Sequence, residues 1–310
     1  MLIVIALGGN ALLQRGEPLE AELQHKNVKS TAYAIAKLAK EHQIVICHGN
    51  GPQVGLLALQ NAAYTQVKSY PLDVLDAESQ GMIGYLIQQE VGNLVPQHGV
   101  VTLLTQIVVD ANDPAFKKPV KPIGPVYTED EAKALSVERG WHVAPDGKYF
   151  RRVVPSPEPK EIVELSAIKA LLKLGNIVIC GGGGGIPVLK GKDKKLSGIE
   201  AVIDKDNTAS LIAEKLNADA LLVLTDVSAV CENFGKSNER KIKAAPAEIL
   251  HKMDFARGSM GPKIYACCRF ADHTTQQRFA AIGNLFELDG ILNGSAGTRI
   301  NNIAQEITYY

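Results

Sequence analysis

Three glycine-rich segments, each directly after a short run of aliphatic residues, constrain this sequence more than any other feature. The segments are residues 8–10, 49–51 and 181–185, and the runs that precede them are Leu2–Ala6, Ile44–Ile46 and Ile177–Ile179. A strand, a glycine turn and a helix in succession are how α/β folds bring backbone N–H groups close to a phosphate. One such turn is common, but three in one chain predict that backbone amides converge on an anion.

Composition excludes several classes of protein. The 310 residues are 46% hydrophobic and 21% charged, which is typical of a globular enzyme. Lys and Arg together number 33, as do Asp and Glu, so the net charge is 0 and a global nucleic-acid-binding surface is not expected. No apolar run reaches the roughly 18 residues of a membrane span, and no membrane partner is expected. The apolar start at Met1–Leu7 lacks a basic lead and predicts a buried strand, not a signal peptide.

The cysteines indicate a reducing compartment. Five are present, an odd number, and they are scattered without the spacing of a metal site. We therefore expect mostly buried, reduced thiols in a cytoplasmic protein.

Alternating strand-like and helix-like segments predict an α/β fold around a doubly wound, mainly parallel sheet. The expected strands are Leu2–Leu7, Ile44–Cys47, Val100–Val109, Asn176–Cys180 and Ala220–Thr225. The expected helices are Asn27–Lys40, Pro52–Ala63, Ala77–Val95, Lys160–Leu174, Asp206–Leu216, Pro246–Met253 and Pro262–His273.

One stretch interrupts this rhythm. Within residues 114–159, seven prolines fall between Pro114 and Pro157 and a possible hairpin turn lies at Asp146-Gly147, and none of the segments between the prolines is long enough for a βαβ unit. We interpret the stretch as an excursion from the main sheet, either a surface insertion or a lid.

Three lysines lie where a phosphate-binding fold needs cations. Lys121 is flanked by prolines, Lys205 stands at an expected helix start, and Lys263 follows a glycine turn that opens a helix. Positioned cations neutralise the charge on the equatorial oxygens during phosphoryl transfer. For any one lysine a solvated surface charge is the simpler explanation, but the shared placement of all three weakens it.

Several polar residues near these lysines allow more than one interpretation of their role. Asp206 fits the N-cap of the helix that follows, and it also fits a role in holding a lysine or a metal. Asp204 and Asp226 are further candidates for approaching Mg²⁺, and the sequence does not choose between them. For His48 we favour packing over acid–base work, because no relay partner is adjacent. The glycines at 181–185 do not form a Walker A loop, since no Lys-Ser/Thr pair follows them.

Taken together, these motifs resemble one family, the carbamate kinases. The matching segments run in order from residue 2 to about residue 300 and include ALGGNAL, HGNGPQVG, SQGMIGY, KPIGP, RVVPSP, GGGGIPV, EAVIDKD, LTDV, NFGK and GSMGPK. The resemblance implies a three-layer αβα sandwich with a mainly parallel central sheet, the amino-acid-kinase fold, plus a small protruding subdomain.

The resemblance also implies an organisation and an activity. Residues 1–190 would form the lobe that binds carbamate or carbamoyl phosphate, with the protruding subdomain at 114–159, and residues 191–310 the nucleotide-binding lobe. The reaction would be reversible phosphoryl transfer between ATP and carbamate, giving ADP and carbamoyl phosphate. Mg²⁺ would accompany the nucleotide, and the assembly would be a homodimer. We expect an ATP-forming role in the catabolism of arginine or of other carbamoyl-yielding nitrogen compounds.

Site residues carry over from the motifs position by position. The implied catalytic residues are Lys121, Lys205, Lys263 and Asp206. The implied carbamoyl-phosphate cradle is Gly8, Gly9, Asn10, Gly49, Asn50 and Gly51. The implied nucleotide-binding residues are Gly182, Gly183, Thr225, Asp226, Val227, Phe234, Lys236 and Met260.

One substitution separates this chain from other members of the superfamily. Many of them have a lysine just before the first glycine pair, where this chain has Leu7, so a cation must come from elsewhere and Lys121 fits that need. Departures from the family pattern fall at Cys47, Asp76, Glu78, Asn207, Thr208 and Ser228, and none removes a proposed phosphate contact.

Two rival functions stay open at this point. The first is a kinase of the same superfamily with another acceptor, such as an amino acid or a nucleoside monophosphate, against which Leu7 and the KPIGP motif argue. The second is a non-catalytic regulatory relative, against which the three intact lysines argue.

Overall fold

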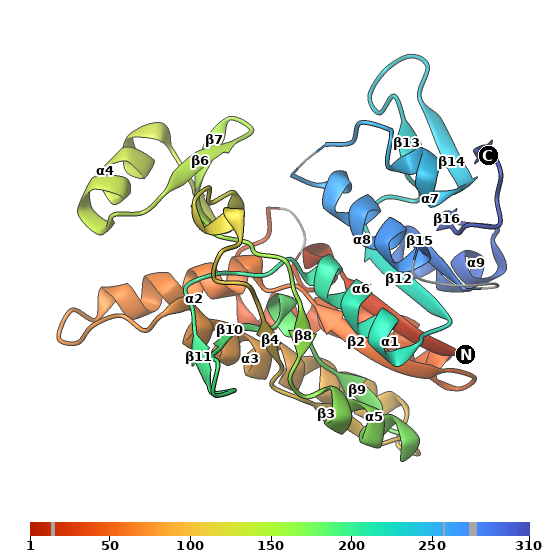
Figure 1. The fold of residues 1–310 in the computed structure, drawn as a ribbon, viewed down its shortest axis with the longest axis horizontal. Coiled ribbons are helices and arrows are strands. Elements are labelled where there is room, and N and C mark those ends of the chain that lie inside the picture. The colour runs from red at the N-terminus through yellow and green to blue at the C-terminus, as the bar shows by residue number, and fades with distance from the viewer. Residues whose placement is uncertain (14–15, 257, 273–277) are drawn as a thin grey trace.

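The computed structural model describes residues 1–13, 16–256, 258–272 and 278–310. Within these residues a ten-stranded sheet forms the centre of the molecule, with helices on both faces (Figure 1). Its strands, in spatial order, are β13 (Cys231–Glu232), β14 (Arg240–Ala245), β16 (Thr298–Ile300), β15 (Phe279–Asn284), β12 (Ala220–Thr225), β1 (Leu2–Leu7), β2 (Gln43–His48), β9 (Ile177–Ile179) and β3 (Val100–Thr102), with β17 (Thr308–Tyr309) beside β14. The pairs from β15 through to β3 are parallel, which confirms the predicted α/β class.

The first strand occupies the middle of the sheet. Strand β1 pairs with β2 on one side, Ile3 opposite Ile44, and with β12 on the other, Ile3 opposite Ala220. Alternate side chains of β1 enter two separate hydrophobic cores, one with Ile3 and Ile5 and one with Val4 and Ala6. A parallel sheet covered on both faces needs such uninterrupted apolar strands.

Each core is completed by its own helices. One face is covered by α1 (Ala21–Ala39), α3 (Leu72–Leu94) and α9 (Leu288–Asn293), and the other by α5 (Leu165–Lys173), α6 (Lys205–Leu216), α7 (Ala247–Leu250) and α8 (Met260–Asp272). Helix α2 (Gly51–Ala63) packs on α3 and on the protruding part of the chain. Two helices begin earlier than expected, α1 at Ala21 and α3 at Leu72, and the expected end of the last helix at His273 lies outside the described residues.

Two predicted elements are wrong. The strand expected over Val100–Val109 is two strands, β3 in the main sheet and β4 (Gln106–Val108) in another, separated where the backbone of Thr105 bonds the Gln80 side chain. The helix expected over Lys160–Leu174 begins only at Leu165, because residues before it form β8 (Glu161–Ile162), which pairs with β4. In both segments the pairing partners of the strands, which the local sequence does not show, decided the structure.

The second, four-stranded sheet lies at one end of the molecule. It has the order β11 (Leu196–Gly198), β10 (Ile186–Lys190), β4 and β8. Strand β10 directly follows the third glycine turn, so this sheet holds the C-terminal end of that turn in place.

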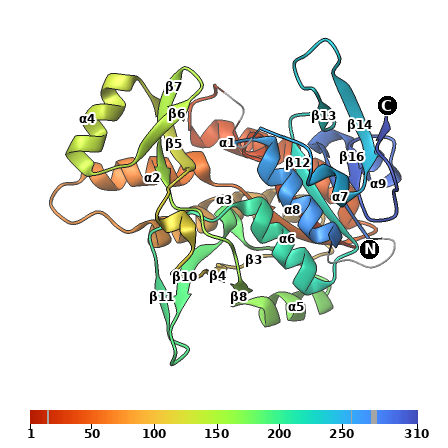
Figure 2. The same ribbon diagram turned by 45° about the horizontal axis from the view of Figure 1, so that its top comes forward.

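The proline-rich excursion is a protruding subdomain (Figure 2). It contains β5 (Lys121–Tyr127), α4 (Glu129–Arg139), β6 (Val143–Asp146) and β7 (Tyr149–Val154), and the three strands form their own antiparallel sheet. The predicted hairpin at Asp146-Gly147 joins β6 to β7. A capping box between Thr128 and Glu131 starts α4.

The subdomain joins the body through a contact that needs two glycines. A Cβ on Gly55 of α2 would come within 1.9 Å of Gly124 Cα in β5, and Gly124 itself has a φ of +72°. Any side chain at Gly55 would therefore push β5 away from α2.

Two further sequence expectations concern membranes and thiols. Within the part of the chain that the structure describes, no helix has the length and hydropathy to cross a membrane. All five cysteines are free thiols, as predicted; Cys231 is half-buried and the other four are buried.

Candidate active site

The site is built around the first turn of α6. Lys205 is the first residue of this helix, and the N-cap is Asp204, whose Oδ1 accepts from the N–H of Asp206 at 2.9 Å and of Asn207 at 3.4 Å. The prediction that Asp206 caps the helix is wrong. Both aspartates have a side chain able to cap, but the helix begins one residue earlier than expected, so Asp206 faces inward from its first turn instead.

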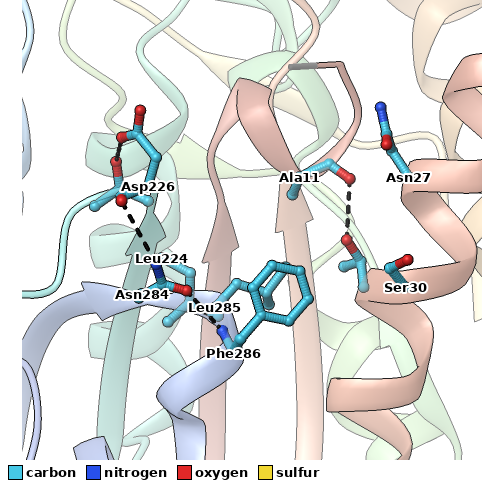
Figure 3. Close-up of a pocket in the computed structure, with 10 residues that line it drawn as sticks. Ala11, Asn27, Ser30, Leu224, Asp226, Asn284, Leu285 and Phe286 are labelled. Carbon is cyan, nitrogen blue, oxygen red and sulfur yellow. Dashed lines mark hydrogen bonds between the residues drawn. The ribbon is translucent and has the colours of Figure 1, made fainter. Parts of the chain in front are cut away.

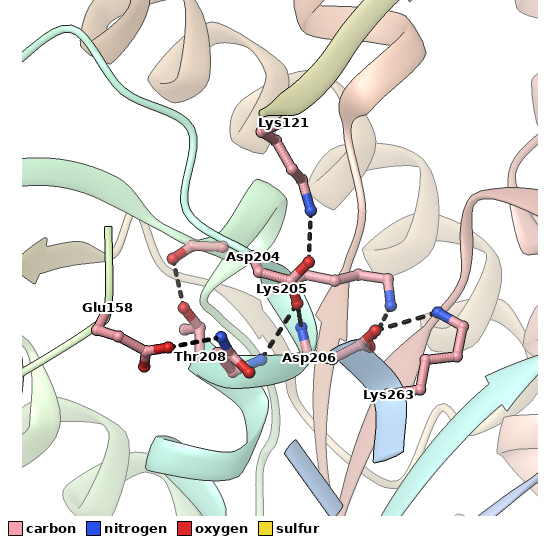
Figure 4. A network of polar contacts seen from close by, with 9 residues as sticks. Lys121, Glu158, Asp204, Lys205, Asp206, Thr208 and Lys263 are labelled. Carbon is pink, nitrogen blue, oxygen red and sulfur yellow. Dashed lines mark hydrogen bonds and ion pairs between the residues drawn. The ribbon is translucent and has the colours of Figure 1, made fainter. Parts of the chain in front are cut away.

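Lys121 reaches this helix end from the protruding subdomain (Figure 4). Its Nζ lies 2.5 Å from Asp204 Oδ2, although the two residues are 83 positions apart in the sequence. The pKa of Asp204 lies below its usual range, because the nearby Lys121 outweighs the burial that would raise it. Asp204 thus holds the subdomain lysine against the body of the protein.

Lys205 and Lys263 share the carboxylate of Asp206. One carboxylate oxygen pairs with Lys205 Nζ, and the other lies 3.1 Å from Lys263 Nζ. Burial alone would raise the pKa of Asp206, but the two ammonium groups overcome it and hold that pKa far below its usual range. Burial lowers the pKa of Lys205, whereas Asp206 raises that of Lys263 despite its burial. The three lysines named from the sequence are therefore gathered on two adjacent aspartates.

The three glycine turns lie close to the start of α6 or to the end of β12. The N–H of Gly8 donates to Leu224 O at 3.0 Å, which ties the turn after β1 to the end of β12. A Cβ on Gly49 would lie 3.3 Å from Lys205 Cδ, and one on Gly184 would lie 2.2 Å from Ile203 O. The second and third turns thus border the start of α6, whereas the first turn borders the end of β12.

Asn50 and His48 face inward beneath the turns. Asn50 is buried, and its Nδ2 donates at 2.8 Å to both Asp76 Oδ1 and Ser79 Oγ on α3. His48 is buried against Gly182, and burial lowers its pKa to about 4, so the ring is neutral at pH 7. Packing, not acid–base work, is therefore the role the structure gives His48, as expected.

The remaining cradle residues are less engaged. Gly9 is exposed and Gly51 is the first residue of α2, whose opening N–H groups have no partner within the helix. Asn10 has a described backbone in the turn Gly9–Ala11, but its side chain lies outside what the structure describes.

A cavity of about 930 Å³ opens beside Lys263. Six of the residues predicted to bind nucleotide line it: Thr225, Asp226, Val227, Phe234, Lys236 and Met260. Gly182 and Gly183 do not; they are buried, and a Cβ on Gly183, at a φ of +66°, would lie 2.2 Å from Asn50 Nδ2. Gly182 and Gly183 therefore lie outside the cavity that the other six predicted nucleotide-binding residues line.

Sequence reasoning missed part of this cavity wall. Met253, Phe255 and Ala256 line it from the segment before α8, and Cys231 lines it from β13. Apolar residues within the otherwise polar stretch 251–259 were the only signal for them in the sequence.

A second hollow lies on the other side of Asp226 (Figure 3). It holds about 320 Å³ between α1 and the residues after β15, and Asn27, Ser30, Asn284 and Phe286 line it. Asn284 Oδ1 accepts from the N–H of Phe286 at 2.9 Å, so one polar group of the hollow's wall already has a hydrogen-bond partner within the protein. Asp226 lines both spaces, and its Oδ1 accepts from Thr225 Oγ1 at 2.9 Å.

The carboxylates do not assemble a complete metal cage. Among the described residues, no group of three or more His, Cys, Asp and Glu side chains is placed to hold a metal ion. A Mg²⁺ ion at this site would therefore need most of its ligands from water and substrate phosphates, which is how Mg²⁺ usually binds in phosphoryl-transfer enzymes.

The fold and the lysine cluster define a phosphotransferase. The chain belongs to the amino acid kinase family, which it matches over residues 1–279. Within that family it belongs with the carbamate kinases. It is 55% identical to a carbamate kinase of Haemophilus influenzae over 311 residues, covering all of both chains, and 45% identical to one of Pyrococcus furiosus, covering 96% of this chain and 98% of the relative.

A solved structure agrees with this assignment. The carbamate kinase of Giardia lamblia bound to AMP-PNP superimposes with a TM-score of 0.87 at 43% identity, covering 97% of this chain and 98% of the other. The expected fold and family are thereby confirmed.

Proposed function

We propose that this protein transfers a phosphoryl group reversibly between ATP and carbamate, giving ADP and carbamoyl phosphate. The observation that carries the proposal is the meeting of Lys121, Lys205 and Lys263 at one helix N-terminus beside the large cavity. The carbamate kinases to which the chain is similar support the choice of acceptor.

The reaction does not require a general base. An anionic oxygen of carbamate attacks the γ-phosphorus, the new O–P bond forms, and the bond to the bridging oxygen of ADP breaks with its electron pair leaving on ADP. No proton has to move from the nucleophile. Catalysis then consists of alignment and of neutralising charge on the transferring group.

Each lysine has a separate position for that task. We assign Lys205, which lies against Gly49, to the transferring phosphoryl group, and Lys263, which lines the cavity, to the nucleotide phosphates. Lys121 would approach from the acceptor side and release Asp204 when substrate arrives. Asp206 is a positioning residue, because it holds two ammonium groups at a fixed separation.

The binding regions follow from the same positions. We place the acceptor near Gly8, Gly9, Asn10, Gly49, Asn50 and Gly51, in a lobe spanning residues 1–190. The Asn50 amide hydrogens are already engaged by Asp76 and Ser79, so the backbone of this turn, not that side-chain N–H₂, would meet the phosphate. The nucleotide would occupy the large cavity in a lobe spanning residues 191–310, and Gly182 and Gly183 would act from beneath, by positioning Asn50.

Magnesium fits this site through Asp226. Its carboxylate is exposed and lines the cavity, whereas Asp204 is engaged by Lys121 and by the helix cap. Bound Mg²⁺ would supply charge neutralisation on the nucleotide phosphates. An Asp226→Asn variant should raise the Mg²⁺ concentration needed for half-maximal activity.

The activity is tested in the ATP-forming direction. Protein mixed with ADP, Mg²⁺ and carbamoyl phosphate should produce ATP above a boiled control. Absence of ATP would contradict the proposal and favour a non-catalytic relative. The same assay with acetyl phosphate tests the acceptor, because faster ATP formation from acetyl phosphate would point to a carboxylate kinase instead.

We further propose that ATP formation is the physiological direction, in the cytoplasm, during breakdown of arginine or another carbamoyl-yielding nitrogen compound. Carbamoyl phosphate is a mixed anhydride whose phosphoryl group transfers readily to ADP. A strain that lacks this protein should accumulate carbamoyl phosphate when such a compound is its energy source; no accumulation would count against this role.

A homodimer is proposed on a separate observation. Met82, Tyr85 and Leu94 are 37%, 59% and 38% exposed, and they belong to α3, which packs on β3, the edge strand of the main sheet. Exposed apolar residues beside a sheet edge are typical of a surface covered by another chain. Light scattering should give twice the chain mass, and Tyr85→Lys should shift it toward the monomer.

A further inference from the structure

A cavity of about 400 Å³ lies between the protruding subdomain and the body. The subdomain contributes Glu138, Arg139, Trp141 and Arg152 to it, and the body contributes residues of α2, α3 and the segments 69–70 and 200. None of its lining residues belongs to the lysine cluster or to the nucleotide cavity.

Two guanidinium groups are gathered on one indole ring in this cavity. The Cζ atoms of Arg139 and Arg152 lie 5.2 Å and 4.4 Å from the centroid of the Trp141 ring. Burial lowers the pKa of Arg152, which shows that bringing this charge here has a cost. Like charges held together over a shared ring call for a negative partner between them.

The chain supplies that partner only in part. Within the described ranges, no carboxylate or carbonyl accepts a hydrogen bond from Arg152, and Arg139 Nη1 is buried without a hydrogen-bond acceptor. Two carboxylates are nearby. Glu138 Oε1 lies 3.6 Å from Arg139 Nε. The negative charge of Glu200, whose Oε1 accepts from the N–H of Leu72 at 3.2 Å, partly offsets the effect of burial on the pKa of Arg152 without a hydrogen bond to it.

We propose that this cavity binds a small oxyanion, a phosphate or a carboxylate, between Arg139 and Arg152. Guanidinium groups present paired N–H donors that match either anion. On the body side, Ser69 and Tyr70 also line the cavity. A bound oxyanion would therefore join the subdomain to the body.

The site is connected to Lys121 through the subdomain sheet. Arg152 on β7 pairs with Ile123 on β5, and Val154 on β7 pairs with Lys121. An anion that fixes Arg152 against the body also fixes the strand that carries Lys121. This consequence rests on the proposed function, but occupancy of the cavity does not.

Trp141 makes the site directly measurable because it is the only tryptophan of the chain. Its fluorescence is followed while inorganic phosphate, or succinate in a parallel series, is added at constant ionic strength set with sodium chloride. The series is run on the wild type and on Lys205→Ala, in which anion binding at the lysine cluster is weakened. Kinase activity is not needed for this measurement, so failure of the proposed function would leave it unaffected.

We expect a saturable change that persists in Lys205→Ala and whose midpoint rises at least tenfold in Arg139→Gln and in Arg152→Gln. Lys148→Gln, which removes an exposed charge from the same subdomain, should match the wild type. Calorimetric titration of the same variants, after melting curves show that they are folded, guards against a changed Trp141 signal. The tighter of the two anions identifies the ligand class. Binding of neither anion, or equal binding by the arginine variants, would overturn the proposal.

Discussion

Two aspartates of this molecule are equally buried and behave in opposite ways. Asp206 is 2% exposed and Asp76 is 0% exposed. Asp206 has a pKa far below its usual range because Lys205 and Lys263 outweigh its burial, whereas burial raises the pKa of Asp76, which has the Asn50 amide as its partner and no cation. The α6 cluster therefore holds fixed charges, whereas burial disfavours charge in the corner beneath the glycine turns.

This difference shows that the fixed charges of the two regions lie at the α6 cluster, where we place the phosphoryl transfer. The ionic cluster keeps fixed cations where a dianion would arrive, so little reorganisation is needed during the reaction. In the corner formed by His48, Asn50 and Asp76, burial disfavours the charged form of both titratable side chains. We expect variants in the two regions to differ in kind, in activity for one and in pH-dependent stability for the other.

The largest effect is expected from removing the shared carboxylate. Asp206→Ala leaves two buried ammonium groups without a counter-charge and should lower the free energy of unfolding by about 3–5 kcal/mol. Urea denaturation measures it. Asp193→Ala, which breaks an exposed pair with Lys195, should leave the free energy of unfolding nearly unchanged. Equal losses would show that Asp206 is not an organising charge.

The next effect is on turnover. Lys205→Ala, Lys121→Ala and Lys263→Ala should each lower kcat by about 10²-fold or more, the scale for one preorganised electrostatic contact. Coupled-enzyme assays of ATP formation measure it. Lys215→Ala, an exposed lysine in the last turn of the same α6 helix, is the matched control and should retain full activity. Near-normal turnover in all three site variants would refute the mechanism.

A smaller effect on stability concerns His48, in the corner beneath the glycine turns. Its folded-state pKa of about 4 lies below the ordinary 6.5, so the unfolded chain binds more protons between these values. Stability should therefore fall as the pH drops from 6.5 to 4, by about 3 kcal/mol at most from this residue. Unfolding measured across that range should show a shallower decline in His48→Gln, while the exposed His142→Gln keeps the wild-type profile.

The smallest effect is expected at Asp76, with the opposite sign. Its folded-state pKa lies above the unfolded value, so the folded protein binds the extra proton and loses stability as the pH rises through that window. Asp76→Asn should remove this loss, with a gain that grows by up to about 1.4 kcal/mol per pH unit. Glu78→Gln, on an exposed position of the same helix, should show no such growth. A constant difference at all pH values would contradict the assignment.

Much of the fold was predictable because buried parallel strands are continuous apolar runs. Leu2–Leu7 and Ala220–Thr225 were found with the same bounds that the structure gives. The split of Val100–Val109 was not predictable, since both halves are apolar and only their partners, β9 and β10, distinguish them.

The site was predictable as a set of residues but not as a geometry. The three lysines were recognised from their positions at turns and helix starts. Their sorting onto two carboxylates depends on a helix that begins at Lys205, one residue before the predicted start. The subdomain arginines around Trp141 gave no signal, because Arg139 and Arg152 are brought together only by the packing of α4 on β7.

The central position of β1 has a consequence for synthesis of the chain. One side of this strand stays unpaired until β12 exists, because Ile3 must meet Ala220 and the N–H of Leu2 must meet Asp219. At ribosomal rates of roughly 5–20 residues per second, that interval is on the order of 10–40 s. During it, the wholly apolar strand β1 has an unpaired edge that only the later part of the chain can cover.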